Sequence, residues 1–154
     1  MLDLVAKKLF LTKGVGVADD KLTSFEFALR QAGIAGTNIV LISSIFPPNA
    51  KLISRKDGLK LIKPGQILFT IYSRNQTNET NRLISASVGI AQPKDRSKYG
   101  YLSEYDTFGK NEIESGDYAE DIAAQMLASS LGIPFDIDKS WDEKRQQWNI
   151  SGQI

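Results

Sequence analysis

The chain's 154 residues suit a single domain, 1–154, and its formal net charge of +1, from 19 Lys and Arg against 18 Asp and Glu without a basic stripe, predicts no nucleic-acid partner. Cysteine and histidine are both absent, which excludes disulfides, Cys or His metal sites, and catalysis by Ser-His-Asp or Cys-His groups. A Mg²⁺ or Ca²⁺ site built from carboxylates alone is left open by this composition, but no EF-hand-like spacing appears and we expect no metal. We expect any general acid or base to be Asp, Glu, Lys, Tyr or a backbone group.

The N-terminal residues give no sign of export or membrane insertion. Charges at Asp3, Lys7 and Lys8 interrupt the first apolar run too early for a signal peptide. No apolar stretch reaches the length needed to span a bilayer. The sequence therefore predicts a cytoplasmic protein with no membrane partner.

The first elements are short. Residues 9–11 and 15–17 are predicted to form a strand or a short hairpin arm, in which glycines permit a bulge or a close approach. Asp19-Asp20 then predicts a turn.

A helix with well-marked ends follows this turn. Thr23 as N-cap and Glu26 three residues later match a capping box, and Leu22 with Phe27 match a hydrophobic staple. Gly33 stands where a left-handed C-terminal cap belongs. We therefore predict a helix from Thr23 to Gly33.

The middle of the chain is predicted to contain two strands. Residues 38–43 carry few polar side chains, which favours a strand buried on both faces, and Pro47-Pro48 prevents its continuation. Residues 51–63 are charged and are interpreted as irregular. Pro64-Gly65 marks a turn before a partly alternating strand at 66–73.

The rest of the chain is predicted to contain three strands and a second helix. Polar loops separate strands at 82–92 and 99–106, a helix at 111–131 and a last strand at 144–151. Gly132 and Pro134 end the helix. Because the strands mostly follow one another directly, we predict an α+β sandwich of mainly antiparallel sheets flanked by helices.

Two adjacent serines are the most unusual feature of the middle region. Ser43-Ser44 ends the apolar run and precedes Ile45-Phe46-Pro47-Pro48. Alone, such a pair is typical of a turn. Between a rigid strand and two prolines, it also places one hydroxyl beside the carbonyl of the preceding residue.

Several segments together resemble the pyruvoyl-dependent arginine decarboxylases. The resemblance covers roughly residues 9–131 and rests on residues 22–29, 32–34, Asn38, 42–48, 90–95 and 100–105. The Ser-Ser-Ile-x-Pro-Pro segment is fairly specific, and the spaced Pro-Lys-Asp and Glu-Tyr segments make a chance similarity improbable. The resemblance implies an αββα sandwich and a trimer of αβ protomers, with active sites between neighbouring subunits.

The resemblance also implies a covalent cofactor. The Ser44 hydroxyl would attack the Ser43 carbonyl to give an ester, and elimination and hydrolysis would leave a pyruvoyl group at position 44. The products are a β chain, 1–43, and an α chain, 44–154. Asn38 matches the asparagine expected to donate a hydrogen bond to the developing oxyanion.

A pyruvoyl group suits the decarboxylation of an amino acid. Its ketone forms a Schiff base with the substrate amine and accepts the electrons of the breaking bond. Pyridoxal phosphate is not expected, because no glycine-rich phosphate cradle appears. By resemblance, Glu104 returns a proton to the substrate carbon, Glu26 occupies the position of a substrate-binding aspartate, and Leu22 lines the same pocket.

Three functions stay open at this point. The first is conversion of arginine to agmatine and carbon dioxide, for polyamine biosynthesis or acid resistance. The second is the same chemistry on lysine or ornithine, because Glu26 is one methylene longer than the aspartate of the family. The third is an unprocessed homologue with a structural or regulatory role. Glu26 as a helix-capping residue, Glu104 as an exposed strand residue and Asn38 as a turn residue are the simpler interpretations of these side chains.

Overall fold

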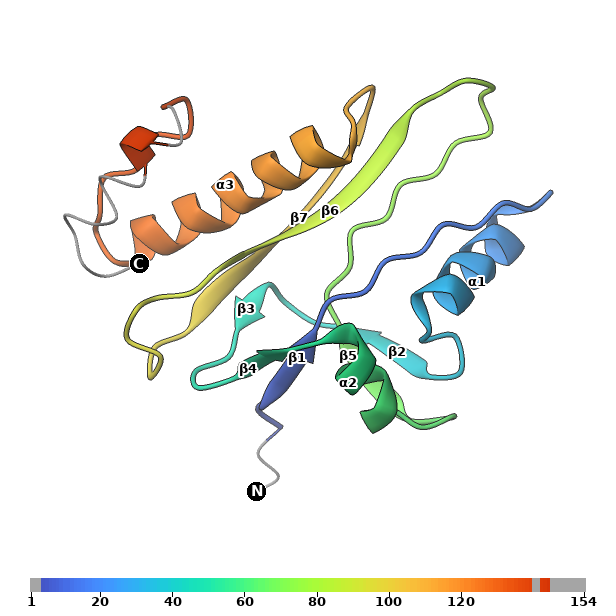
Figure 1. The fold of residues 1–154 in the computed structure, drawn as a ribbon, viewed down its shortest axis with the longest axis horizontal. Helices are drawn as coiled ribbons and strands as arrows, with labels where there is room; N and C mark the ends of the chain where they lie inside the picture. Colours follow the sequence, from blue (N-terminus) through green and yellow to red (C-terminus); the bar gives the residue numbers. More distant parts are fainter. Residues whose placement is uncertain (1–3, 140–141, 145–154) are drawn as a thin grey trace. The chain divides into compact units, whose positions relative to one another are not determined.

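A computed structural model describes residues 4–139 and 142–144, which fall into two compact units (Figure 1). Among these residues, the first unit contains 4–42 and 50–70, and the second contains 43–49, 71–139 and 142–144. In chain order the elements are β1 (Lys8–Phe10), α1 (Lys21–Ala32), β2 (Asn38–Leu41), β3 (Ile45–Phe46), β4 (Lys51–Ile53), α2 (Arg55–Leu61), β5 (Ile67–Thr70), β6 (Ile84–Ala91), β7 (Gly100–Phe108) and α3 (Glu112–Ser130). The predicted α+β class is confirmed.

The first unit contains two parallel strand pairs. β1 pairs with β4 with Lys8 opposite Lys51, and β2 pairs with β5 with Asn38 opposite Ile67. The expectation of mainly antiparallel sheets is wrong for these pairs. In each pair a long stretch of chain separates the two strands, which permits the crossover connection that parallel strands require. The periodicity of side chains along a strand does not indicate the direction of its neighbour.

β2 is also shorter and more exposed than the sequence predicted. It ends at Leu41, and within the single chain Val40 and Leu41 are 39% and 61% exposed. The prediction of a strand buried on both faces is therefore wrong for the chain by itself. The faces of a two-stranded sheet are buried only where other elements cover them, and two strands alone do not provide that cover.

Helix α1 begins two residues before the predicted N-cap. Asp20 is the N-cap, and its carboxylate accepts a hydrogen bond from the Thr23 backbone N–H at 2.9 Å. The Thr23–Glu26 capping box is therefore wrong, because the preceding aspartate is itself a strong N-cap residue. The predicted left-handed cap is confirmed at Gly33, where φ is 84°.

Residues 12–16 run along α1, and residues 15–17, predicted to belong to a strand or a short hairpin arm, are not in a strand. Thr12 Oγ1 donates to the Ala32 carbonyl at 2.6 Å, so this segment runs antiparallel to the helix. A Cβ on Gly14 would overlap the Ala28 carbonyl, and one on Gly16 would overlap the Ser24 carbonyl. Two extended residues rise about 6.6 Å and four helical residues about 6 Å, so every second residue meets a new helical turn. Glycine permits this close approach.

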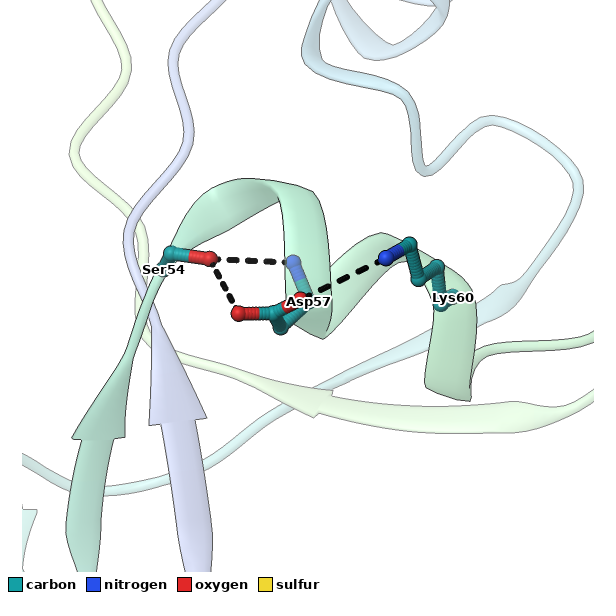
Figure 2. Close-up of polar contacts among 3 residues, drawn as sticks. All are labelled: Ser54, Asp57 and Lys60. Atoms are coloured by element: carbon teal, nitrogen blue, oxygen red, sulfur yellow. Dashed lines mark hydrogen bonds and ion pairs between the residues drawn. The ribbon is translucent and has the colours of Figure 1, made fainter.

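The segment predicted to be irregular, 51–63, contains β4 and helix α2. Figure 2 shows why the helix begins at Arg55: Ser54 Oγ accepts from the Asp57 backbone N–H at 3.1 Å and donates to Asp57 Oδ2 at 2.7 Å. Lys60 Nζ lies 3.5 Å from Asp57 Oδ1. A serine followed three residues later by an acidic residue is a helix-start pattern, so the charges of this segment belong to a capped helix.

The second unit is an antiparallel sheet, β3–β7–β6, covered by α3 on one face (Figure 1). The predicted strands at 82–92 and 99–106 and the helix at 111–131 are confirmed with small shifts of their ends. Small side chains of α3 make its packing close: a Cβ on Gly89 would overlap the Ala119 carbonyl, and Ser103 Oγ donates to that same carbonyl. The buried cluster contains Ala91, Ala123, Ala124 and Leu127.

The described C-terminal residues lie against α3. Lys144, which is 5% exposed, contacts Asp121 at 2.7 Å between Nζ and Oδ2. Lys144 belongs to a helical turn, 142–144, and not to the predicted strand 144–151, whose other residues lie outside the described part of the chain. Within 4–139 and 142–144, no helix has the length and apolar content needed to cross a membrane.

Candidate active site

Ser44 lies at a bend between β2 and β3, where the sheet of the second unit begins. Its backbone carbonyl accepts a hydrogen bond from the Leu102 backbone N–H at 2.9 Å, which places Ser44 opposite Leu102 on β7. The next two residues continue the ladder, with Ile45 opposite Tyr101 and Phe46 opposite Gly100. Ser44 is therefore held by backbone pairing at the edge of an antiparallel sheet.

The alternation of β7 determines which side chains stand near Ser44. Ser103 and Tyr105 face α3, since Ser103 bonds to Ala119 and the Tyr105 ring lies 4.6 Å from that of Tyr118. Successive strand residues point to opposite faces, so Leu102 and Glu104 lie on the other face. Glu104 is exposed there.

The structure brings Ser44 and Glu104 together, although they are 60 residues apart in the sequence. Ser44 Oγ lies 3.0 Å from both carboxylate oxygens of Glu104 and donates its proton to them. Glu104 is two residues beyond Leu102 on β7 and so lies diagonal to Ser44 on the same face, which is within reach of a glutamate side chain. This arrangement pairs a nucleophile with a proton acceptor, as general-base chemistry requires.

Ser43 contributes its carbonyl to the same place. The Ser43 oxygen accepts a hydrogen bond from the Ile45 backbone N–H at 2.9 Å, across Ser44. The Ser43 side chain is exposed. The peptide bond between the two serines thus has an acceptor for the hydroxyl proton on one side and a hydrogen-bond donor to its carbonyl on the other.

Tyrosines near this site take part in packing against α3. Burial raises the pKa of the Tyr101 hydroxyl, and a hydrogen bond with Tyr99 raises it further. A hydrogen bond with Thr107 lowers the pKa of Tyr105, against an opposing effect of burial. Because Tyr101 and Tyr105 share a face of β7 with Ser103, their hydroxyls lie on the opposite face from Glu104.

Leu22 and Glu26 form a separate group on helix α1. Four residues apart, they lie on the same side of the helix, and Leu22 is 78% exposed. The Glu26 Oε1 atom accepts a hydrogen bond from Arg30 Nε at 2.8 Å. The carboxylate therefore already binds a guanidinium group, which belongs to this chain.

Asn38 stands at the start of β2 and closes the β2–β5 pair. Its Nδ2 donates to the Gly65 carbonyl at 2.8 Å, where Gly65 has the left-handed conformation expected of the predicted turn, with φ at 77°. The side chain is exposed. Its described contact is thus a structural one within the first unit.

Three groups that contact the candidate site residues were not predicted from the sequence: the Arg30 side chain and the backbone N–H groups of Ile45 and Leu102. Arg30 could have been found, because residues four apart on a helix meet and a Glu followed by an Arg at that spacing is favourable. The backbone N–H groups of Ile45 and Leu102 leave no signal in residue identity, since every residue but proline has one. Within the described residues, no group of three or more acidic side chains is placed to hold a metal ion.

Comparison with known proteins gives a consistent result. A sequence profile of the family described as pyruvoyl-dependent arginine decarboxylase matches residues 8–153. A pyruvoyl-dependent arginine decarboxylase of Nitrosopumilus maritimus is 79% identical over 154 residues, which cover 100% of this chain and 84% of that protein.

Two further relatives are similar over nearly the whole chain. A probable pyruvoyl-dependent arginine decarboxylase of Chlorobaculum tepidum is 55% identical over 99% of this chain and 84% of its own length. A pyruvoyl-dependent arginine decarboxylase of Methanococcoides burtonii is 51% identical over 98% of this chain and 84% of its own length. The similarity extends well beyond the segments around Ser44.

Proposed function

Because the chain belongs to the pyruvoyl-dependent arginine decarboxylase family, we propose that it cleaves itself between Ser43 and Ser44 and then decarboxylates L-arginine to agmatine and carbon dioxide. The observation that carries this proposal is the contact of Ser44 Oγ with both oxygens of Glu104 at 3.0 Å. Self-cleavage yields a β chain, 1–43, and an α chain, 44–154, whose first residue becomes the pyruvoyl group.

Glu104 has two uses in this scheme. Before cleavage, its carboxylate accepts the proton of the Ser44 hydroxyl, which makes that oxygen a better nucleophile toward the Ser43 carbonyl. After cleavage, the same side chain returns a proton to the substrate carbon that has lost carbon dioxide. One carboxylate would suffice for both, because the first proton leaves the hydroxyl of residue 44 and the second goes to a substrate carbon that would be held at the same residue.

The surroundings of Ser44 suit a group that remains attached to the α chain. Leu102 N–H holds the carbonyl of residue 44, and the pairing of Ile45 and Phe46 with β7 lies on the α-chain side of the bond. When present, the pyruvoyl group supplies an acceptor for the electrons of the carbon–carbon bond that breaks as carbon dioxide leaves. Cleavage thus leaves residue 44 anchored to β7 beside Glu104.

Glu26 and Leu22 are proposed to bind the substrate side chain. The contact of Glu26 with Arg30 supports this, because it presents a carboxylate that already accepts a guanidinium N–H. Substrate arginine would replace Arg30 at Glu26, and its methylene groups would pack on Leu22. Asn38 is proposed to act on the Ser43–Ser44 region through its amide.

We also propose that residues 1–154 act as one domain, an αββα sandwich, and that αβ protomers form a trimer with active sites between neighbouring subunits. Exposed apolar side chains on β2 and just after it support an interface: Val40, Leu41 and Ile42 are 39%, 61% and 40% exposed in the single chain. Light scattering of the purified protein gives the mass of the assembly and tests this proposal.

Intact-mass measurement of the purified protein tests the cleavage. We expect two fragments that divide after Ser43, with the larger lacking a free amino group. Ser44→Ala should remain one chain and have no decarboxylase activity. A Ser44→Ala protein with normal activity would refute the mechanism, and an uncleaved wild-type chain without activity would favour a structural or regulatory role.

A second substrate class is favoured by the length of Glu26. Its carboxylate extends about 1.5 Å further than an aspartate would, which suits a shorter substrate such as ornithine, and lysine is the other basic candidate. Turnover of arginine, lysine and ornithine by wild type and by Glu26→Asp separates these cases. If both proteins prefer arginine equally, Glu26 does not set the substrate's length.

A further inference from the structure

We infer that the backbone N–H of Ile45 is the hydrogen-bond donor that stabilises the negative charge developing on the Ser43 carbonyl oxygen during self-cleavage. This inference rests on the proposed cleavage between Ser43 and Ser44. The backbone N–H of Ile45 thus has a catalytic role in the processing step, and the Ile45 side chain has none.

The contact has the geometry that such a donor needs. The Ile45 nitrogen lies 2.9 Å from the Ser43 oxygen, within the range of about 2.7–3.1 Å typical of oxyanion donors. It joins residues two apart and so encloses Ser44 in a γ-turn. Ser44 is not among the described residues with positive φ, so the turn is of the common inverse kind. The residue that supplies the nucleophile is therefore the centre of the turn.

The pairing of β3 with β7 explains why this N–H is available. Ser44 stands at a hydrogen-bonded position, since its carbonyl accepts the Leu102 N–H at 2.9 Å. Hydrogen-bonded and non-hydrogen-bonded positions alternate along an antiparallel pair. Ile45, opposite Tyr101, is thus at a non-hydrogen-bonded position, and its N–H points away from β7. The sheet leaves this donor free for the Ser43 carbonyl.

The processing step balances with the groups present. Ser44 Oγ forms a bond to the Ser43 carbonyl carbon while its proton passes to the Glu104 carboxylate. The electron pair of the carbonyl moves onto the Ser43 oxygen, where the Ile45 N–H stabilises it. When the pair returns, the bond between that carbon and the Ser44 nitrogen breaks, and the nitrogen takes the proton from Glu104. The products of this step are an ester and a free amine.

Asn38 differs from Ile45 in what it contacts. Its Nδ2 donates to the Gly65 carbonyl at 2.8 Å. Within the described chain, the donor seen on the Ser43 oxygen is the Ile45 N–H.

The simplest test compares Ile45→Pro with Ile45→Val in the full chain. Proline removes the N–H and valine keeps it, so we expect the first protein to stay whole while the second cleaves at the wild-type rate. Rapid cleavage of Ile45→Pro would overturn the inference. Because proline also restricts Ser44 to extended conformations, a second variant with a smaller change is needed.

That variant replaces Ile45 by 2-hydroxy-3-methylpentanoic acid through cell-free translation, which keeps the side chain and exchanges the N–H for an ester oxygen. We expect cleavage after Ser43 to slow roughly 100- to 1000-fold, the cost of removing one oxyanion donor. Fragment masses distinguish this cleavage from hydrolysis of the new ester after Ser44.

The matched control places 2-hydroxy-4-methylpentanoic acid at Leu102. It removes the bond to the Ser44 carbonyl and leaves the Ile45 N–H intact. We expect this protein to cleave far faster than the variant at position 45. Equal slowing of the two would mean that Ile45 acts only by anchoring β3, and would overturn the inference. A wild-type chain that stays whole in the same system would instead refute the proposed cleavage itself.

Discussion

Two carboxylates with proposed roles, one in each unit, are positioned in different ways. Glu104 lies on strand β7 and meets a hydroxyl that is 60 residues away in the sequence. Glu26 lies on helix α1 and meets Arg30, four residues away. The first contact depends on the register of a sheet, and the second follows from one turn of a helix. Bond-making is thus the role proposed for the strand region around Glu104, and recognition is the role proposed for the helix region around Glu26.

The largest effect is expected at the strand region. Glu104→Gln keeps the size of the side chain and removes the proton acceptor, so kcat should fall by roughly 100- to 10,000-fold and self-cleavage should slow as well. Asp106→Asn is the matched control, because Asp106 is exposed on the same face of β7, two residues further on. Rates of fragment formation and of carbon dioxide release measure the two effects. Equal losses in both variants would contradict a specific role for Glu104.

A smaller and different effect is expected at the helix region. Glu26→Gln removes the charge that would pair with a guanidinium, so KM for arginine should rise about 10- to 100-fold. Self-cleavage should proceed at the wild-type rate, because recognition and processing use different groups. Steady-state kinetics and fragment analysis of the same sample give both numbers. Slowed cleavage in this variant would show that the two regions do not act separately.

The strand region should also depend on its packing against α3. Gly89→Ala places a Cβ against the Ala119 carbonyl, so the free energy of unfolding should fall by about 1–3 kcal/mol. Gly116→Ala is the control, since nothing lies within 4 Å of its added Cβ and alanine favours helix by roughly 0.5–1 kcal/mol. Urea unfolding of uncleaved Ser44→Ala chains measures both. Stabilisation by Gly89→Ala would contradict this account of the packing.

Removing the resident guanidinium sharpens the comparison further. Arg30→Gln frees Glu26 from an exposed ion pair worth about 0.3–0.5 kcal/mol, so KM for arginine should fall about two-fold. Lys60→Gln, which breaks the exposed ion pair with Asp57, should leave KM unchanged. A rise in KM for Arg30→Gln would mean that Arg30 assists binding instead of competing with the substrate.

The smallest effect concerns the start of α1. A hydrogen bond with the Thr23 side chain and a second with its backbone N–H lower the pKa of Asp20. A carboxyl whose folded pKa is depressed stabilises the fold above its unfolded-state pKa, and this stability is lost as pH falls through the folded pKa. Asp20→Asn should therefore lower Tm slightly at neutral pH, and this Tm difference should shrink as the pH falls through the lowered pKa of the Asp20 carboxyl. A Tm difference that grows toward acid would contradict this sign.

The sequence predicts the ends of helices well where a single cap residue determines where the helix starts or stops. Gly33, Asn111 and Gly132 stop or start helices close to the predicted positions, because cap geometry depends on a few neighbouring residues. The same kind of signal was misread at Thr23, where Asp20 is the cap. At Ser54 a cap residue stands within a charged segment, and the charges alone predict irregular structure where α2 begins.

Pairing between distant strands was less accessible to sequence reasoning. The parallel pairs β1–β4 and β2–β5 join segments separated by long connections, and alternation of side chains does not distinguish parallel from antiparallel neighbours. The exposure of Val40 and Leu41 likewise depends on what covers a strand, which its own residues do not specify.

The sequence by itself determined the chemistry that this protein has available. With no histidine or cysteine, it limited any general acid or base to Asp, Glu, Lys, Tyr or a backbone group, and its resemblance to a known family indicated Ser44 and Glu104. Only the tertiary structure decided that these two meet at 3.0 Å and that the Ser43 carbonyl accepts the N–H of Ile45. Residue types report which groups can react, whereas strand register, set by the packing of the whole sheet, decides which groups are in reach.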